Sequence, residues 1–510
     1  MPRKAVAARR VAAMLAAGIA EGRAVATMIE PVTVPLWLFV AIGAFALWSV
    51  LDRLLIPSTR WFLRGRVNRL IGRINRRLDI EIKPFQLTRR QVLIDRLLYD
   101  PQVVMAAAEY ARAGNMPADA AMVRARRYAS KIVPAFNAYF YFRIGYGLAR
   151  GLARALYRVR MGYADADALA AVPSDATVVF VMNHRSNMDY VLVAFLAADR
   201  TALSYAVGEW ARIWPLQQLI RAMGAYFVRR NSNDPLYRRV LERYVHMATE
   251  AGVAQAMYPE GGLTRDGKLR PPRLGLLDYA LKSFDPAGTR DVVFVPVGIN
   301  YDRVLEDRTQ LRAGDADAKR VGGWQAFRVT ARFWGRNVGQ MIRGRWFRFG
   351  YACVNFGTPV SARAWLATNT PDSGGDLRRL DKDARFAVID RLGGDLMRAI
   401  GAVVPVLPVS LVSSVLLDAT EPMDELGLKA AASDRMEALQ AAGAKLYLPR
   451  ADRDYAIHVG LRMLTLRRLV AVDDNGLYAA VAAERPLLTY YANAIAHLRP
   501  TGADPAMDAR

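Results

Sequence analysis

A histidine and an aspartate stand five residues apart in VVFVMNHRSNMDYVLVAFL, residues 178–196. The chain has only four histidines, and His184 follows a β-branched run while Asp189 precedes an apolar run of different period. On one continuous helix the two side chains would diverge by roughly 140°. With His184 in a loop and Asp189 in the first helical turn, the carboxylate can orient the imidazole, which then accepts a proton from a hydroxyl. Taken alone, the pair is more typical of a helix cap than of a catalytic site.

Charged residues and glycines follow two further predicted strands. GAYFVRR ends in Arg229 and Arg230, and YPEGGLTRDGKLRPPR places Glu260 directly before Gly261 and Gly262. The second loop continues with three more cations, Arg265, Lys268 and Arg273. Arginines that gather at neighbouring strand ends predict a pocket for a phosphate group, and glycines let backbone amides approach a ligand closely. These repeated strand ends favour a catalytic interpretation of His184 over a cap alone.

The elements that must position these residues alternate between β-branched runs and stretches of helical length. Strands are predicted at 176–183, 202–207, 224–230, 253–260, 292–299 and 350–357. Such alternation is typical of an α/β layered domain with a mostly parallel sheet flanked by helices, in which reactive groups collect at the carboxyl ends of the strands. Helix is expected from Asp119 to Val159, before the first strand.

Four regions are predicted along the chain. They are a basic N-terminus with an apolar membrane segment and an arginine-rich amphipathic helix (1–85), a helical region (86–160), the α/β domain (161–365) and a C-terminal helical region (366–510).

Together, these motifs resemble the four blocks of the glycerolipid acyltransferase superfamily: NHRSNMD, GAYFVRR, YPEGGLTR and a V-P-V block in VVFVPVGI. They span roughly residues 176–304, about a quarter of the chain. Within the superfamily, the chain is similar to the large glycerol-3-phosphate acyltransferases in its HRSNMDY form and in the C-terminal segment LLTYYANAIAHL. It departs from their E-G-G-R-S-R pattern at Leu263 and Thr264.

The resemblance implies transfer of a fatty acyl group from acyl-CoA or acyl-acyl-carrier-protein to the sn-1 hydroxyl of glycerol 3-phosphate, which gives lysophosphatidate in phospholipid biosynthesis. His184, oriented by Asp189, would be the general base. The pocket that binds the acceptor's phosphate would be formed by Arg229, Arg230, Glu260, Gly261, Gly262, Arg265 and Arg273. Amides near the two glycines would bind the oxyanion, and neither a metal nor another cofactor is implied. Lysophosphatidate and dihydroxyacetone phosphate remain alternative acceptors.

The charge balance indicates a polyanionic partner. The chain carries 71 basic and 47 acidic side chains, which gives a formal charge of +24, and such a surplus suits anionic lipid, nucleic acid or CoA-type ligands. A basic membrane-attached lipid- or nucleic-acid-binding protein without catalysis is therefore an alternative, but it leaves His184, Asp189 and Glu260 unexplained, and we expect no nucleic acid. The single cysteine, Cys353, excludes an intrachain disulfide.

The N-terminal region predicts membrane attachment. Residues 31–51, PVTVPLWLFVAIGAFALWSVL, are uncharged and as a helix would reach roughly 30 Å, enough to cross a bilayer. A re-entrant or in-plane helix and a buried core helix remain open alternatives, because Pro31 and Pro35 stand at its start. The basic segment 60–83 mixes arginines with apolar residues, as helices on anionic headgroups do. We expect attachment to the cell membrane (inner or plasma membrane), with the catalytic domain facing the cytoplasm.

Overall fold

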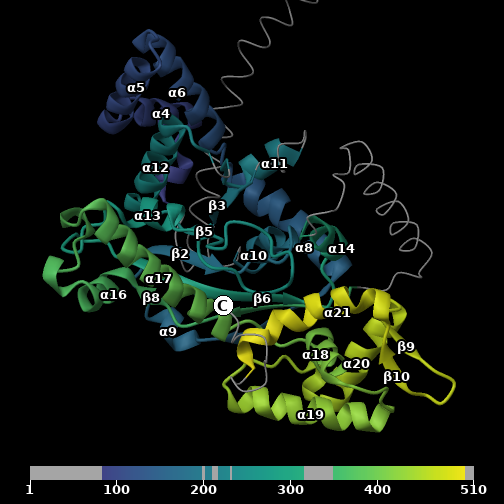
Figure 1. Cartoon of the computed structure of the whole chain (residues 1–510). Coiled ribbons are helices and arrows are strands. Elements are labelled where there is room, and N and C mark those ends of the chain that lie inside the picture. Colours follow the sequence, from purple (N-terminus) through teal and green to yellow (C-terminus); the bar gives the residue numbers. More distant parts are fainter. Residues whose placement is uncertain (1–82, 198–201, 209–215, 230–231, 315–348, 500–510) are drawn as a thin grey trace, which may run out of the picture. The chain divides into compact units, whose positions relative to one another are not determined.

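A computed structural model describes residues 83–197, 202–208, 216–229, 232–314 and 349–499 of the 510-residue chain (Figure 1). All of them belong to one unit that comprises residues 71–510. The predicted apolar segment 31–51 and the arginine-rich segment that follows it lie outside the described residues. Among the described helices, none combines the length and the apolar character needed to cross a membrane.

The centre of the described unit is an eight-stranded mixed sheet (Figure 1). Its strands lie in the order β1 (Arg158–Ala164), β7 (Tyr351–Phe356), β6 (Val292–Tyr301), β2 (Thr177–Met182), β5 (Gln255–Met257), β3 (Ser204–Val207) and β4 (Ala225–Phe227), with β8 (Val360–Ser361) pairing with β6. The five strands from β6 to β4 are mutually parallel, β1 is parallel to β7, and β7 and β8 run antiparallel to β6. The predicted α/β class with a mostly parallel sheet flanked by helices is confirmed.

The central strands are buried along their whole length. β2, β6 and β7 expose no residue, as expected for β-branched runs covered by helices on both faces. The edge strand β1 was not predicted: helix was expected through Val159, whereas α8 (Tyr146–Leu156) ends at Leu156. Its sequence RVRMGYA is mostly exposed and lacks the apolar run by which the other strands were found.

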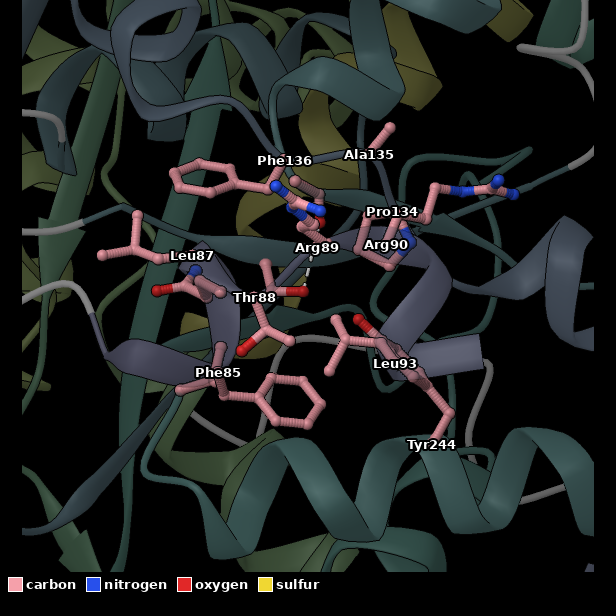
Figure 2. A pocket seen from close by; sticks show the side chains of 14 residues that line it. Phe85, Leu87, Thr88, Arg89, Arg90, Leu93, Pro134, Ala135, Phe136 and Tyr244 are labelled. Atoms are coloured by element: carbon pink, nitrogen blue, oxygen red, sulfur yellow. Dashed lines mark hydrogen bonds between the residues drawn. The ribbon is translucent and has the colours of Figure 1, made fainter. Parts of the chain in front are cut away.

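Helices α4 (Arg90–Leu98), α5 (Pro101–Ala113) and α6 (Ala118–Ile132) pack with α12 (Pro235–Glu250) around a second apolar core (Figure 1). A pocket of about 240 Å³ lies beside them. Figure 2 shows the rings of Phe85, Phe136 and Tyr244 around this pocket, and Arg90 donates from Nε to the Val133 carbonyl at 3.1 Å. None of the predicted site residues lines it.

Beyond α16 (Ala362–Asn369) and α17 (Lys382–Ala402), the C-terminal region is mostly helical, as predicted. It contains α18 (Pro408–Asp418), α19 (Glu425–Ala441), α20 (Arg453–Leu466), α21 (Arg485–Ala492) and a small hairpin of β9 (Val470–Val472) and β10 (Tyr478–Ala480). These helices share one apolar core with the sheet. Asn300 on β6 donates from Nδ2 to the Pro405 carbonyl at 2.9 Å, which ties the region to the centre of the sheet.

Candidate active site

His184 and Asp189 lie at the carboxyl end of β2 and at the start of α10 (Met188–Ala197). The Ser186 hydroxyl accepts the Met188 amide at 3.1 Å and so caps the helix. The loop brings His184 Nδ1 to 2.8 Å from Asp189 Oδ2, and the same oxygen accepts the amides of Arg185 (2.8 Å) and Ser186 (3.1 Å). The predicted contact between the two side chains is therefore present, and Asp189 fixes both the ring and the backbone of the loop.

The other oxygen of Asp189 is held from the neighbouring strand. Tyr301, the last residue of β6, donates its hydroxyl to Oδ1 at 2.5 Å. Burial raises the pKa of Tyr301 well above its ordinary value, and the adjacent Asp189 raises it further, so the phenol keeps its proton and stays a donor. Asp189 thus accepts hydrogen bonds on both oxygens and remains an acceptor for the imidazole.

The free edge of the imidazole is its Nε2 atom. Within the described residues, Nε2 is buried and has no hydrogen-bond partner. The ring stacks on Tyr258 with 4.0 Å between centroids and meets Tyr190 edge-on at 5.4 Å. A buried imidazole whose Nδ1 faces a carboxylate and whose Nε2 lacks a hydrogen-bond partner can accept a proton from a hydroxyl placed against Nε2.

Glu260 braces the histidine loop from β5. Its Oε1 accepts the His184 amide at 2.9 Å, and its Oε2 accepts the Arg270 amide at 3.1 Å. The side chain is buried, and this desolvation raises the pKa of Glu260 to about 7, although the two amides and the nearby guanidinium groups of Arg185 and Arg270 lower it. The carboxylate therefore joins the loops that follow β2 and β5.

Two of the predicted arginines line one cavity of about 400 Å³ beside this brace. Arg229 and Arg273 share its wall with Gly261 and with Tyr258, the ring on which His184 stacks. The Arg229 guanidinium lies over the Tyr237 ring at 5.5 Å. Two arginines and the Tyr258 ring therefore line the same cavity, and the imidazole of His184 stacks on that ring.

Gly261 is required for this arrangement. Its φ is +67°, and a Cβ there would lie 2.5 Å from Arg273 Cδ. Its amide donates to the Tyr258 carbonyl at 2.9 Å, so it is already engaged and not open to an oxyanion. The buried Gly262 follows it in the turn.

Of the remaining predicted arginines, only Arg265 is described, and it does not line this cavity. Arg265 is exposed and lies outside the cavity wall, and Arg230 falls outside the described residues. The structure therefore brings together only part of the predicted phosphate site, namely Arg229 and Arg273.

Sequence reasoning missed a buried group around Arg185. Its guanidinium donates to the Gly267 carbonyl at 2.9 Å and lies over the Tyr490 ring of α21 at 5.2 Å. The Tyr490 hydroxyl donates to Gln310, whose amide donates in turn to the Arg185 carbonyl. Tyr490 belongs to the LLTYYANAIAHL segment, which was the available signal, but its contact with the histidine loop crosses some 300 residues of chain.

Glu306 was also missed. One of its oxygens accepts the Ser186 hydroxyl at 2.8 Å and the other accepts the Asn187 side-chain amide at 3.0 Å. Burial raises its pKa above the usual range. Glu306 thus holds Ser186 and Asn187, whereas Glu260 holds the His184 amide. The position of Glu306 just after β6 is the signal that would have suggested it.

Comparison with known families covers both the sheet and the C-terminal helices. The model of the acyltransferase family matches residues 167–300, and that of the glycerol-3-phosphate acyltransferase C-terminal region matches residues 337–501. The two segments together make up more than half of the chain. The chain belongs to the glycerol-3-phosphate acyltransferase family. The first segment contains His184, Asp189 and every other predicted site residue.

Curated relatives named glycerol-3-phosphate acyltransferase agree with this assignment. The protein of Pseudoalteromonas atlantica is 27% identical over 425 residues, and that of Pseudomonas putida strain W619 is 28% identical over 441 residues. Both alignments cover 81% of this chain but only 50% and 49% of the relatives. The chain therefore spans about half the length of the curated relatives it matches. Among solved structures, the 1-acyl-sn-glycerophosphate (LPA) acyltransferase of Thermotoga maritima aligns over 50% of this chain and 79% of its own, with 18% identity and a TM-score of 0.27.

Proposed function

We propose that this member of the glycerol-3-phosphate acyltransferase family transfers a fatty acyl group from an acyl thioester, acyl-CoA or acyl-acyl-carrier-protein, to the sn-1 hydroxyl of glycerol 3-phosphate. One observation carries the proposal. The imidazole of His184, whose Nε2 has no partner among the described residues, stacks on Tyr258, and this ring also lines the cavity that Arg229 and Arg273 line. A small acceptor that carries both a phosphate and a hydroxyl suits such a pair of sites.

In the proposed reaction, the acceptor oxygen attacks the thioester carbonyl while its proton passes to His184 Nε2. The imidazolium is stabilised by Asp189, which faces Nδ1 at 2.8 Å. As the tetrahedral intermediate collapses, the C–S bond breaks and the departing sulfur takes the proton back from Nε2. Atoms and charges balance without a covalent acyl-enzyme, a metal or a redox cofactor. The Gly261 amide already donates to the Tyr258 carbonyl. Of the two glycines in this turn, Gly262 is therefore the one whose amide we propose as an oxyanion donor.

The proposed setting is the cytoplasmic face of the cell membrane. The charge of +24 and the apolar and arginine-rich segments within residues 31–83 support it. Anionic lipids are the proposed partners of these segments, and nucleic acid is not.

The first test is thiol release by the purified full-length chain. Glycerol 3-phosphate, dihydroxyacetone phosphate and lysophosphatidate are compared as acceptors, with acyl-CoA and acyl carrier protein thioesters as donors. We expect glycerol 3-phosphate to be used best. His184→Ala should lower kcat at least about 100-fold, because a positioned base contributes that much or more. His458→Ala, an exposed position on α20, serves as the matched control. The mechanism is wrong if no acceptor is acylated or if the His184 variant turns over normally.

The second test addresses the phosphate contact. Arg229→Ala should raise the KM for glycerol 3-phosphate about ten- to a hundred-fold, the cost of one lost charge-assisted hydrogen bond, and leave the donor KM nearly unchanged. Arg229→Lys keeps the charge but loses the planar guanidinium, so its KM for glycerol 3-phosphate should lie between those of the wild type and of Arg229→Ala. Arg312→Ala, exposed on α14 (Asp307–Gly314), controls for loss of surface charge. Equal effects on both KM values would argue against a role in phosphate binding.

A further inference from the structure

Helix α8 carries an apolar row that the rest of the described chain leaves uncovered. Ile144, just before the helix, and Leu148 and Leu152 within it follow one another at four-residue intervals and are 42%, 56% and 37% exposed. The adjoining side of the helix is buried through Ala149 and Ala153, and the helix packs beside α10 (Figure 1). Large apolar side chains on one line of an otherwise well-packed helix indicate a surface that meets another apolar phase.

The charge around this row has a single sign. No aspartate or glutamate occurs between Asp119 and Asp165. Arg143 and Arg150 are exposed on the same helical segment, on a different side from the row, and neither has a carboxylate partner within the described residues. Exposed leucines and arginines on one helix suit the interface of an anionic bilayer, where acyl chains lie beneath negatively charged headgroups.

An apolar cavity lies directly beneath the row. Its volume is about 180 Å³, and its wall runs from Leu148 and Leu152 to Asn187 and Tyr190 at the start of α10. Tyr190 is the ring that meets His184 edge-on at 5.4 Å. The cavity is therefore lined both by the exposed row and by Tyr190, a ring in contact with the imidazole.

We propose that α8 lies in the interface of an anionic membrane, with Ile144, Leu148 and Leu152 among the acyl chains and Arg143 and Arg150 at the phosphates. The cavity beneath then gives an acyl chain a route from the bilayer toward His184. This second step rests on the proposed function, whereas the membrane contact of α8 does not.

The test places a probe on α8 in the full-length chain reconstituted into vesicles that contain phosphatidylglycerol. The only native thiol, Cys353, is buried and its pKa is raised to about 12 by that burial, so a new exposed cysteine is labelled selectively. An environment-sensitive fluorophore is attached to Leu148→Cys and, as the matched control, to Leu426→Cys, which replaces a leucine that is 75% exposed on α19. Quenching by nitroxide-labelled lipid and by aqueous iodide is then measured for each.

We expect the label at position 148 to be quenched by nitroxide lipid and shielded several-fold from iodide, and the label at 426 to behave in the opposite way. Arg143→Glu combined with Arg150→Glu should reduce the shielding at 148 in anionic vesicles but not in phosphatidylcholine alone. Iodide quenching at 148 equal to that at 426 overturns the proposal. So does shielding of 148 from both quenchers, which would mean that protein covers the row. If acyl transfer fails while the lipid contact at 148 is present, only the proposed function and the acyl route fall.

Discussion

Two carboxylates serve one histidine in different ways. Asp189 binds the side chain of His184, whereas Glu260 binds its backbone amide. Asp189 accepts hydrogen bonds from the Tyr301 hydroxyl and from two backbone amides. Glu260 accepts only two amides in a site that excludes water, and its pKa is raised to about 7. Burial therefore brings the pKa of Glu260, which holds the loop, near neutrality.

The raised pKa of Glu260 predicts how the free energy of unfolding depends on pH. Between about pH 4.5 and 7, the folded state binds a proton at Glu260 that the unfolded state has lost, so the free energy of unfolding falls as pH rises through this window. Glu260→Gln removes the titration. The difference in unfolding free energy, variant minus wild type, should therefore rise from pH 5 to pH 8, by at most about 3 kcal/mol. Chemical denaturation of both chains at a series of pH values measures it.

Taking the difference cancels contributions shared by the two chains. Asp302, also buried and with a pKa raised to about 7, belongs to that background. A difference that stays flat across the window would contradict a titrating Glu260.

At the scale of elements, the sequence predicted what local pattern encodes. Six strands of the sheet were found because each is a short, mostly apolar and buried run between stretches of helical length. His184 was placed correctly at the seam between β2 and α10 because that pairing needs only five residues. Tyr301 was within reach as well, since it lies two residues beyond a predicted strand that runs parallel to β2. The edge strand β1 was missed because its exposed RVRMGYA carries no continuous apolar signal.

Contacts that depend on distant loops could not be predicted in the same way. Arg229 and Arg273 share a cavity because the turn at Gly261 lets the Arg273 side chain approach, while Arg265, eight residues before Arg273, faces solvent. Nothing in local periodicity separates the two. The Arg185–Tyr490 contact is likewise set by tertiary packing rather than by any motif spacing.

At the scale of the described unit, the C-terminal helices are part of the site's support. Tyr490 lies under the Arg185 guanidinium, and Asn493 donates from Nδ2 to the Asp266 carbonyl at 2.9 Å. The loop after β5 therefore lies between the histidine loop and α21. The two matched family segments, although separate in sequence, together hold the loop that carries His184 in this chain.

The backbone of Gly267, in the loop after β5, lies against the backbone of Tyr490 in α21. Its φ is +88°, and a Cβ would lie 1.9 Å from the Tyr490 carbonyl oxygen. Gly443, at φ +81°, is the matched control, because no atom of the described residues lies within 4 Å of the position that a Cβ would occupy there. Gly443→Ala should cost about 1–2 kcal/mol of unfolding free energy from backbone strain alone. Gly267→Ala should cost about 1–3 kcal/mol more, because backbone atoms must move apart.

The same displacement should also reach the reaction. Moving α21 away from Gly267 disturbs Tyr490 and hence Arg185, which lies next to His184 in the chain, so Gly267→Ala should lower kcat with little change in either KM. Gly443→Ala should leave kcat unchanged, which separates a general loss of stability from a loss of alignment. Thermal unfolding and steady-state thiol release on both variants make the comparison. If the two variants lose equal stability and equal kcat, the contact between the loop after β5 and α21 does not support His184.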